Sequence, residues 1–464
     1  MKKIFKQVVT DASLVGATAM VFSKGKIVEK LTYGYYDREN KKKMTTDTNV
    51  RIASVSKIMV ALCLMRLNEE GKVDLDLDIS EYLGFEVRNP KFPDKIITLR
   101  MILAHTSSIT DGIELEDGSG VNGYNGINGT NEECSLKDLL HPEGKYYVKE
   151  TYSDNEPGVY YEYSNFGCGI IACVVEIITG EYFTDYVRKL IFEPLEIDAS
   201  FIVTEVKTKR IASTYGHKDG ENFLKRTKEN FAKNIYKKFP IGQNFRGPAG
   251  GCFISAEGLM KLLITLVNGG SPIINKDTLA KMLQINYLGK KREWLADTAR
   301  GLHLSILSHF DNHRLFGHFG DAYGVKSNLL FNPKEQFGIV FITNGGGFKY
   351  QKCGIADVQE KLIQAAIDKY WNVEYPSIFK FNVADDYGYL LDRKIILDKK
   401  VTDEGVYFHK KSIFDALGIN TLKDYEYFEN EEYFLLDKVL EDFKEKYQFQ
   451  ILKSEDAYLI SYNL

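Results

Sequence analysis

The fold of this chain is decided by residues 51–71, which read RIASVSKIMVALCLMRLNEEG. Apolar residues recur at helical spacing from Ile58 until Gly71, which predicts a buried helix that begins near Ser54. Ser54 and Lys57 stand three positions apart at its start, so the hydroxyl and the amine lie on one face of the helix, one turn apart. The segment therefore predicts a nucleophile and a base held together on a rigid core helix.

The chemistry of this pair follows from its place at a helix start. A serine hydroxyl becomes a nucleophile when a neighbouring base removes its proton, and a lysine that loses its hydration can be that base. The helix N-terminus adds N–H groups that can stabilise an oxyanion. Two other segments have the same spacing, Ser23–Lys26 and Ser377–Lys380, but neither opens a long apolar helix. A capping serine beside a solvated lysine remains the alternative at Ser54.

A second motif, Tyr163-Ser164-Asn165, precedes an apolar helix predicted at residues 166–179. A tyrosine next to a buried ammonium can relay a proton, and the asparagine amide offers a substrate both a donor and an acceptor. The alternative is a surface tyrosine followed by a helix-capping asparagine. Tyr370-Trp371-Asn372 repeats the spacing, so the pattern alone does not decide between them.

A third motif, His318-Phe319-Gly320-Asp321, comes just before a β-rich run at residues 327–331. Gly320 would let the backbone approach a ligand closely, and an adjacent N–H group could complete an oxyanion hole. The alternative is an ordinary histidine at the edge of a strand. Together the motifs make acyl transfer through Ser54 the chemical hypothesis.

In this order, the three motifs resemble those of the serine β-lactamase and penicillin-binding-protein superfamily, in its class C-like branch. That branch includes D,D-carboxypeptidases, esterases and D-amino-acid amidases and peptidases. The segment 98–107 also resembles a family stretch that ends in His-Thr-Ser-Gly, with Ser108 in place of the glycine. Pro157-Gly158 and the turn Gly247–Gly251 match two further family stretches. The resemblance covers about residues 5–370.

The resemblance implies an α/β fold, with an antiparallel sheet flanked by helices, a largely helical second lobe, and Ser54 between the two. It implies that Ser54 is the acylated nucleophile and that Lys57 and Tyr163 share the general-base and general-acid work. Substrate binding would involve Asn165, His318, Gly320 and Asp321, and the oxyanion hole would use the backbone N–H groups of Ser54 and Asp321. No metal and no cofactor are expected.

The third motif departs from the family's Lys-Thr-Gly form, because His318 replaces the lysine and Phe319 replaces the hydroxyl. Asp321 adds a negative charge beside them. We therefore expect a penicillin or a D-Ala-D-Ala terminus, which carries a carboxylate, to bind less well than an ester, an amide or a peptide with a free amine. A D,D-carboxypeptidase or β-lactamase stays open as an alternative. So does a catalytically silent sensor or scaffold, whose pocket the irregular segment 111–162 could cover as a lid.

Length and composition set the remaining expectations. The 464 residues suggest a hydrolase domain at 1–372 and a small α+β appendage at 373–464. A net charge of −4 argues against a nucleic-acid partner, and no apolar run is long enough for a membrane span. The first residues lack the apolar block of a signal peptide, and the six cysteines form no metal-binding pattern. These features predict a cytoplasmic enzyme that acts on a small molecule or peptide.

The sequence of the appendage contains two similar segments, which predict an internal repeat. A strand-like aromatic pair followed by a short helix is predicted at 405–418 and again at 432–443. The tail faintly resembles the stalk-like domain at the N-terminus of copper amine oxidases, because Ile413–Gly418 matches the ending of its repeats. Packing, binding or self-association is the expected role. Coincidence in a sequence rich in Tyr and Phe is the alternative.

Overall fold

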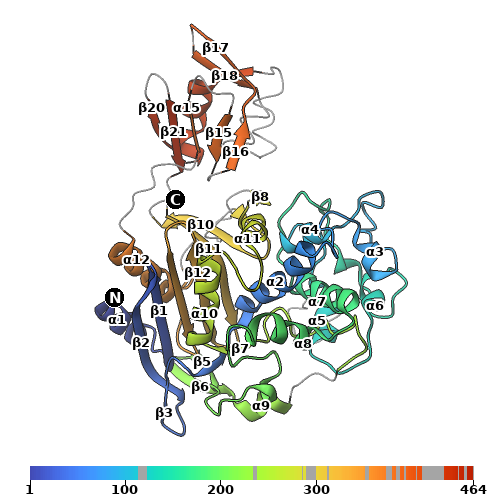
Figure 1. Cartoon of the computed structure of the whole chain (residues 1–464), viewed down its shortest axis with the longest axis vertical. Helices are drawn as coiled ribbons and strands as arrows, with labels where there is room; N and C mark the ends of the chain where they lie inside the picture. The colour runs from blue at the N-terminus through green and yellow to red at the C-terminus, as the bar shows by residue number, and fades with distance from the viewer. Residues whose placement is uncertain are drawn as a thin grey trace.

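The computed structural model describes residues 1–112, 123–233, 238–284, 286–288, 299–310, 313–350, 355–371, 379–382, 387–390, 393–403, 405–409, 433–447, 449–453 and 457–462. Its main feature is an antiparallel sheet (Figure 1). Within these residues the strand order is β3-β2-β1-β13-β12-β11-β10-β9-β8. The strands are β1 (Gly16–Ser23), β2 (Lys26–Asp37), β3 (Lys42–Lys43), β8 (Tyr287–Leu288), β9 (Ala299–Arg300), β10 (Ser305–Phe310), β11 (His313–Ala322), β12 (Val325–Asn332) and β13 (Phe337–Thr343).

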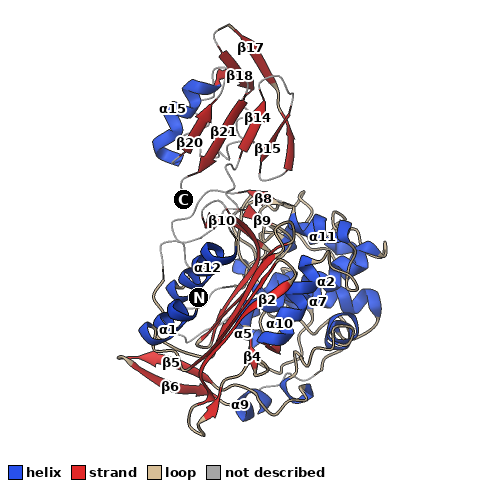
Figure 2. Ribbon diagram, turned by 60° about the vertical axis from the view of Figure 1, so that its left-hand side comes forward, coloured by secondary structure: helices blue, strands red, loops and turns tan. Residues whose placement is uncertain are grey.

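Helices cover both faces of this sheet (Figures 1 and 2). One face packs against α2 (Ser56–Glu69) and α10 (Ala256–Val267), and α7 (Asn165–Thr179) packs on α2. The other face packs against α1 (Lys2–Asp11) and α12 (Asp357–Tyr370). Strand β1 shows why: Met20 and Phe22 belong to the first core, whereas Ala19 and Val21 belong to the second. Alternating side chains of a strand point to opposite faces, so both faces are apolar. The expected antiparallel sheet flanked by helices is confirmed.

A largely helical lobe lies beside the first face (Figure 1). It includes the two long apolar helices α2 and α7, whose positions were predicted from their sequences. Its shorter elements are α3 (Ile79–Leu83), α4 (Leu99–Leu103), α5 (Gly123–Asn128), α6 (Leu136–Leu140), η2 (Lys149–Thr151), α8 (Phe183–Val187), η3 (Arg188–Phe192), η4 (Val203–Glu205), α9 (Lys228–Lys233) and α11 (Lys276–Leu283). The segment expected to be irregular, 111–162, thus holds three short helical turns, and residues 113–122 lie outside the described part.

Small paired strands complete the first 371 residues. Strand β4 (Asn49–Arg51) pairs with β7 (Phe253–Ser255), which ties the residues before Ser54 to the turn Gly247–Gly251. Strand β5 (Thr214–Lys218) pairs with β6 (Glu221–Arg226). Five of the six cysteines are described, and all five are buried free thiols. In the described residues, no single helix is long and apolar enough to cross a membrane.

The last part of the chain contains two antiparallel sheets. One has the order β16-β15-β14-β21-β20, and the other has the order β17-β18-β19. The repeat predicted here is seen in part: β19 and α15 form a strand–helix unit, whereas the helix expected at 412–418 lies outside the described residues. The elements are β14 (Phe379–Asn382), β15 (Tyr387–Leu390), β16 (Arg393–Ile396), β17 (Lys399–Thr402), β18 (Gly405–His409), β19 (Tyr433–Leu435), α15 (Leu436–Tyr447), β20 (Phe449–Lys453) and β21 (Ala457–Tyr462).

Candidate active site

Ser54 lies in a tight 3-10 turn, η1 (Ala53–Val55), immediately before α2. Ala53 has a φ of 49°, a left-handed conformation that is costly for a residue with a Cβ atom. Two short hydrogen bonds hold the turn: Ser56 Oγ donates to the carbonyl of Ala53 at 2.6 Å, and Ser327 Oγ donates to the carbonyl of Ile52 at 2.6 Å. The turn is therefore fixed both to its own helix and to strand β12. Backbone strain that the surroundings maintain is typical of functional sites.

Gly320 lets strand β11 come close to this turn. A Cβ atom at Gly320 would lie 2.3 Å from the carbonyl oxygen of Ile52 and 2.2 Å from Ser327 Oγ. Any side chain here would push the strand away from Ser54 or break the hydrogen bond that holds the turn. The backbone at Gly320 was expected to approach a ligand closely. In the structure the group that it approaches closely is the turn that carries Ser54.

The Lys57 amine joins the first two motifs. Its side chain is fully buried, and Nζ donates hydrogen bonds to Ser54 Oγ at 3.2 Å, to Asn165 Oδ1 at 2.8 Å and to the carbonyl oxygen of Ala249 at 3.0 Å. The alternative of a solvated lysine is therefore wrong. Three acceptors use all three N–H groups of the ammonium form, and the neutral amine would have a lone pair to offer Ser54.

Tyr163 lies over the amine and reaches solvent. Lys57 Nζ is 4.7 Å from the centroid of the Tyr163 ring, and this side chain is 37% exposed. The centroid of the His318 ring is 6.2 Å from the centroid of the Tyr163 ring. His318 is buried, and its Nδ1 lies 2.5 Å from the carbonyl oxygen of Phe319. Residues from three distant segments thus surround Ser54 and Lys57.

Asp111 is a neighbour that sequence reasoning did not single out. Its Oδ1 accepts hydrogen bonds from the backbone N–H of Phe166 at 2.8 Å and from Ser164 Oγ at 3.0 Å. Its Oδ2 accepts from Asn165 Nδ2 at 2.7 Å. The carboxylate therefore stabilises the N-terminus of α7. It also orients the Asn165 amide, so that the amide oxygen is the atom presented to Lys57.

This arrangement predicts the effect of Asp111→Asn. An amide nitrogen in place of Oδ2 would face the amino group of Asn165, so we expect the Asn165 side chain to turn and present its amino group to Lys57. Because an ammonium cannot bond to that group, we expect acylation of Ser54 to slow by about 10–100-fold, as when an outer partner of a reactive group is lost. The rate of covalent labelling by a fluorophosphonate measures it.

A matched double variant tests the cause. In Asp111→Asn combined with Asn165→Asp, the amide at position 111 can donate to a carboxylate at 165, whose other oxygen can accept from Lys57. We expect this exchange to restore the contact with Lys57 but only part of the lost rate, because a carboxylate pairs more strongly with an ammonium group than with the neutral amine that accepts the Ser54 proton. Single and double variants that are equally slow, with equally lowered melting temperatures, would show that Asp111 acts only by stabilising the fold.

Two buried histidines pack beside Tyr163. The ring of His105 lies 4.5 Å from the Tyr163 ring and 4.9 Å from the ring of His303, between centroids. The His105 Nδ1 atom accepts a hydrogen bond from the backbone N–H of Ser164 at 3.2 Å. Burial, and then the positive charge of Lys57, lower the pKa of His303 well below its usual value and that of His318 to about 3. Burial also lowers the pKa of His105, so the rings around Tyr163 stay neutral near pH 7.

These shifts predict a loss of stability in mild acid. The unfolded chain takes up a proton at each histidine near pH 6.5, whereas the folded chain does not, so unfolding is favoured as the pH falls. Asparagine suits the left-handed φ of 51° at His303. Between pH 7 and pH 5, we expect His303→Asn to lose about 2 kcal/mol less unfolding free energy than the unmodified chain. Urea melts at the two pH values measure this, and parallel losses would contradict it.

The side chain of Asp321 does not face the substrate side. On β11 it points to the face opposite Gly320, where it forms an ion pair with Lys326 and accepts a hydrogen bond from the Tyr350 hydroxyl at 2.9 Å. The expectation that its charge would repel a substrate carboxylate is therefore wrong. Successive residues of a strand point to opposite faces, so a residue next to Gly320 cannot share its face. The role expected for the Asp321 backbone N–H group is not affected.

The described residues offer no obvious metal site, because no group of three or more His, Cys, Asp and Glu side chains among them could hold a metal ion. What this arrangement can do is acyl transfer: a hydroxyl, an amine within hydrogen-bonding distance, and an accessible phenol lie together. The roles of the individual residues stay predictions.

The sequence of the chain is similar to those of several known proteins. A family model described as Beta-lactamase matches residues 1–359. Protein flp of Staphylococcus aureus (strain N315) is 24% identical over 343 residues, which cover 74% of this chain and 62% of flp. Esterase EstB of Burkholderia gladioli is 31% identical over 204 residues, which cover 44% of this chain and 51% of the esterase. The chain thus matches less than two thirds of the length of either relative.

Similarity of fold extends to solved structures. The crystal structure of D-amino acid amidase from Ochrobactrum anthropi SV3, complexed with L-phenylalanine amide, aligns with a TM-score of 0.58 at 24% identity. The alignment covers 79% of this chain and 97% of the amidase. Because the family model matches well over half of the sequence, the chain belongs to the Beta-lactamase family.

Proposed function

We propose that this protein is a serine hydrolase that acts through an acyl-enzyme on Ser54. The observation that carries the proposal is the buried Lys57 amine, which lies 3.2 Å from Ser54 Oγ and 2.8 Å from Asn165 Oδ1. A buried cation is costly unless several partners compensate it. A lysine kept at such a site, in contact with a strained serine turn, is well explained by proton transfer.

The proposed reaction has two halves. Ser54 Oγ attacks the carbonyl carbon of an ester or amide, and its proton passes to neutral Lys57 or, through Tyr163, toward the leaving group. The carbonyl carbon gains a bond to Oγ and loses its bond to the leaving alcohol or amine, which departs with the proton. Water then adds to the ester on Ser54 while Lys57 and Tyr163 take its proton. The bond between the acyl carbon and Ser54 Oγ breaks, that proton passes to Oγ, and the carboxylic acid is released. The backbone N–H groups of Ser54 and Asp321 would stabilise each oxyanion.

The proposed substrates are esters, amides or peptides that contain a D-amino acid. Membership of the family supports acyl chemistry, and the names of two similar proteins, an esterase and a D-amino acid amidase, support these classes. His318 limits the choice of substrate further, because it places a buried neutral ring where relatives with a Lys-Thr-Gly motif have a cation. We therefore keep the expectation that a substrate carboxylate is poorly bound, now because a positive charge is missing and not because Asp321 repels it.

A substrate panel tests the proposal. A p-nitrophenyl ester, a D-amino-acid anilide and a chromogenic cephalosporin are offered side by side, and fluorophosphonate-treated protein is digested to locate the label by mass. We expect hydrolysis of the ester or the anilide, with the label on the peptide that contains Ser54. Turnover of the cephalosporin alone would favour the β-lactamase alternative. Neither turnover nor label would favour the silent sensor or scaffold.

We propose a hydrolase domain at residues 1–372 and an appendage at 373–464 that serves packing, binding or self-association. A cytoplasmic location and a small-molecule or peptide substrate are proposed with it. Gel filtration of the full chain and of a chain that ends at residue 372 tests self-association, since only the full chain should form an oligomer.

A further inference from the structure

A cavity is lined in part by the turn Gly247–Gly251, the same turn whose Ala249 carbonyl accepts a hydrogen bond from Lys57. It has a volume of about 350 Å³, which is large enough for a small organic ligand. Ser54, Lys57 and Tyr163 are not among its lining residues. We call it the basic cavity, because the charged side chains among its described lining residues are Arg51, Arg226, Lys233, Lys238, Arg246 and Glu176. Among these described residues, five cations against one carboxylate make the cavity suited to an anion, although Lys238 is also paired with Asp185.

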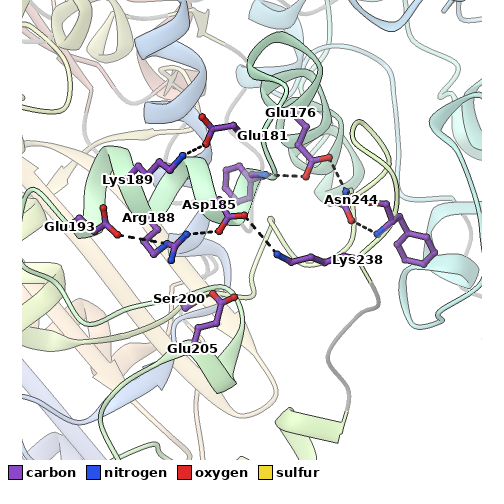
Figure 3. A network of polar contacts seen from close by, with 12 residues as sticks. Glu176, Glu181, Asp185, Arg188, Lys189, Glu193, Ser200, Glu205, Lys238 and Asn244 are labelled. Atoms are coloured by element: carbon purple, nitrogen blue, oxygen red, sulfur yellow. Dashed lines mark hydrogen bonds and ion pairs between the residues drawn. The ribbon is translucent and has the colours of Figure 1, made fainter.

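The single carboxylate is already used by the fold. Glu176 accepts hydrogen bonds from the backbone N–H groups of Phe183 at 3.0 Å and Gly242 at 2.8 Å, and from Asn244 Nδ2 at 2.9 Å. Figure 3 shows it directed at Asn244, away from the Lys238–Asp185 pair, whose charged atoms are 3.8 Å apart. Burial raises the pKa of Glu176. These neutral donors already occupy its oxygens, and it is one carboxylate against five cations among the described lining residues.

The cations of the basic cavity differ in the contacts that hold them. Arg246 is only 6% exposed, and its Nε and Nη2 atoms donate to the backbone carbonyls of Ile127 at 3.1 Å and Glu132 at 2.8 Å, which are neutral acceptors. Within the described part of the chain, neither Arg226 nor Lys233 forms an ion pair. An anion could thus bind without first displacing a carboxylate from these two side chains.

The walls of the cavity are aromatic as well as basic. The guanidinium carbons of Arg51 and Arg226 lie over the Tyr323 ring, 4.5 Å and 4.2 Å from its centroid. Such stacking holds the planar guanidinium groups in fixed positions. The other aromatic residues among the described lining are Tyr182, Phe183, Phe201, Phe231 and Phe253. A ligand with a flat apolar body beside its negative charge would use both features.

The turn Gly247–Gly251 separates the basic cavity from Ser54. Gly247, Pro248 and Gly251 line the cavity, whereas the carbonyl of Ala249 accepts from Lys57 Nζ at 3.0 Å. The carbonyl of Gly250 accepts from Arg51 Nε at 2.9 Å. A ligand that draws on Arg51 would therefore act on the same turn that positions the Lys57 amine.

We propose that the basic cavity is a second ligand site, which binds an organic anion with a flat apolar body, such as an aromatic carboxylate. This goes beyond the proposed hydrolase function, because binding there needs no chemistry at Ser54. The probe is 2-naphthoate, and 2-naphthamide is its uncharged counterpart. Binding to the Ser54→Ala protein is followed by titration calorimetry, so the result does not depend on acylation.

Matched variants locate the probe. We expect Arg226→Gln to weaken 2-naphthoate binding about tenfold, as loss of a charge-assisted contact does, while Lys26→Gln, an exposed charge on β2, has no effect. His318→Asn changes the Ser54 side and should leave the affinity within twofold. Arg246→Gln should weaken binding further if it folds, but the test does not depend on it.

Three results would overturn the proposal. The first is equal affinity for 2-naphthamide and 2-naphthoate. The second is that 2-naphthoate binds Arg226→Gln as tightly as it binds the parent protein, or that it binds neither of them. The third is a loss of binding in His318→Asn without a loss in Arg226→Gln, which would move the ligand to the Ser54 side of the turn.

Discussion

Ser54→Ala is expected to abolish covalent labelling by a fluorophosphonate and to reduce ester hydrolysis by at least about 10³-fold. The hydroxyl is the atom that forms the covalent bond in the proposed reaction, and removal of a nucleophile leaves only the weak catalysis given by binding and the oxyanion hole. The fold should survive, because Lys57 Nζ, at 3.2 Å, is the one side chain among the described residues that bonds to Ser54 Oγ. Gel-based labelling and initial rates measure the loss.

The chain offers its own control in Ser23→Ala. Ser23 has the same spacing to Lys26 as Ser54 has to Lys57, but Ser23 ends strand β1 and Lys26 begins β2. Its hydroxyl donates to the carbonyl of Tyr370 at 3.2 Å. We expect this variant to label at the parent rate. If Ser54→Ala labels as well as Ser23→Ala, another residue carries the chemistry and the hydrolase proposal fails in its present form.

The parts of the site that sequence predicted are those whose chemistry is concentrated in short motifs. Ser54, Lys57 and Asn165 were expected to meet, and hydrogen bonds join Lys57 to both of the others. The first two motifs could be predicted because each combines reactive atoms with a helix start. A spacing of three residues on a helix already fixes a contact, so little tertiary information was needed.

The missed residues depend on tertiary contacts that leave no local pattern. Asp111 reaches the N-terminus of α7 across more than fifty positions, and His303 meets His105 from a segment with no motif at all. Helix α1 was missed for another reason. Its apolar residues Phe5, Val8 and Val9 do have helical spacing, but these first residues were compared only with the pattern of a signal peptide, which they do not match.

Asp321 is the opposite case, because a local rule, the alternation of side chains along a strand, already predicts which way its side chain points. Strand β11 was expected to present both Gly320 and the Asp321 carboxylate to the substrate. The pairing of Gly320 with Ser327 and of Asp321 with Lys326 places the two residues on opposite faces. The two-residue period of a strand already requires this. Substrate preference must therefore be argued from His318.

Lys57→Met is expected to slow acylation by about 10³-fold or more while the protein stays folded. General-base catalysis contributes on the order of 10²–10⁴ to a rate, and here the same amine also orients Ser54 and Asn165. Methionine has nearly the length of lysine and suits a buried position. It leaves three acceptors without a donor, but it also removes a buried charge, so the two effects on stability oppose each other. Labelling rates and thermal melts report the two properties separately.

Lys57→Arg decides between two roles for the amine. Arginine keeps the positive charge and the donors but does not give up a proton in proteins. If Lys57 accepts the Ser54 proton, arginine should be as inactive as methionine. If the charge only orients Ser54 and Asn165, arginine should recover a large part of the rate. Acylation of Lys57→Arg within tenfold of the parent chain would thus contradict the assignment of Lys57 as the base and leave the Tyr163 phenol, 37% exposed and above the amine, as the group to test by Tyr163→Phe.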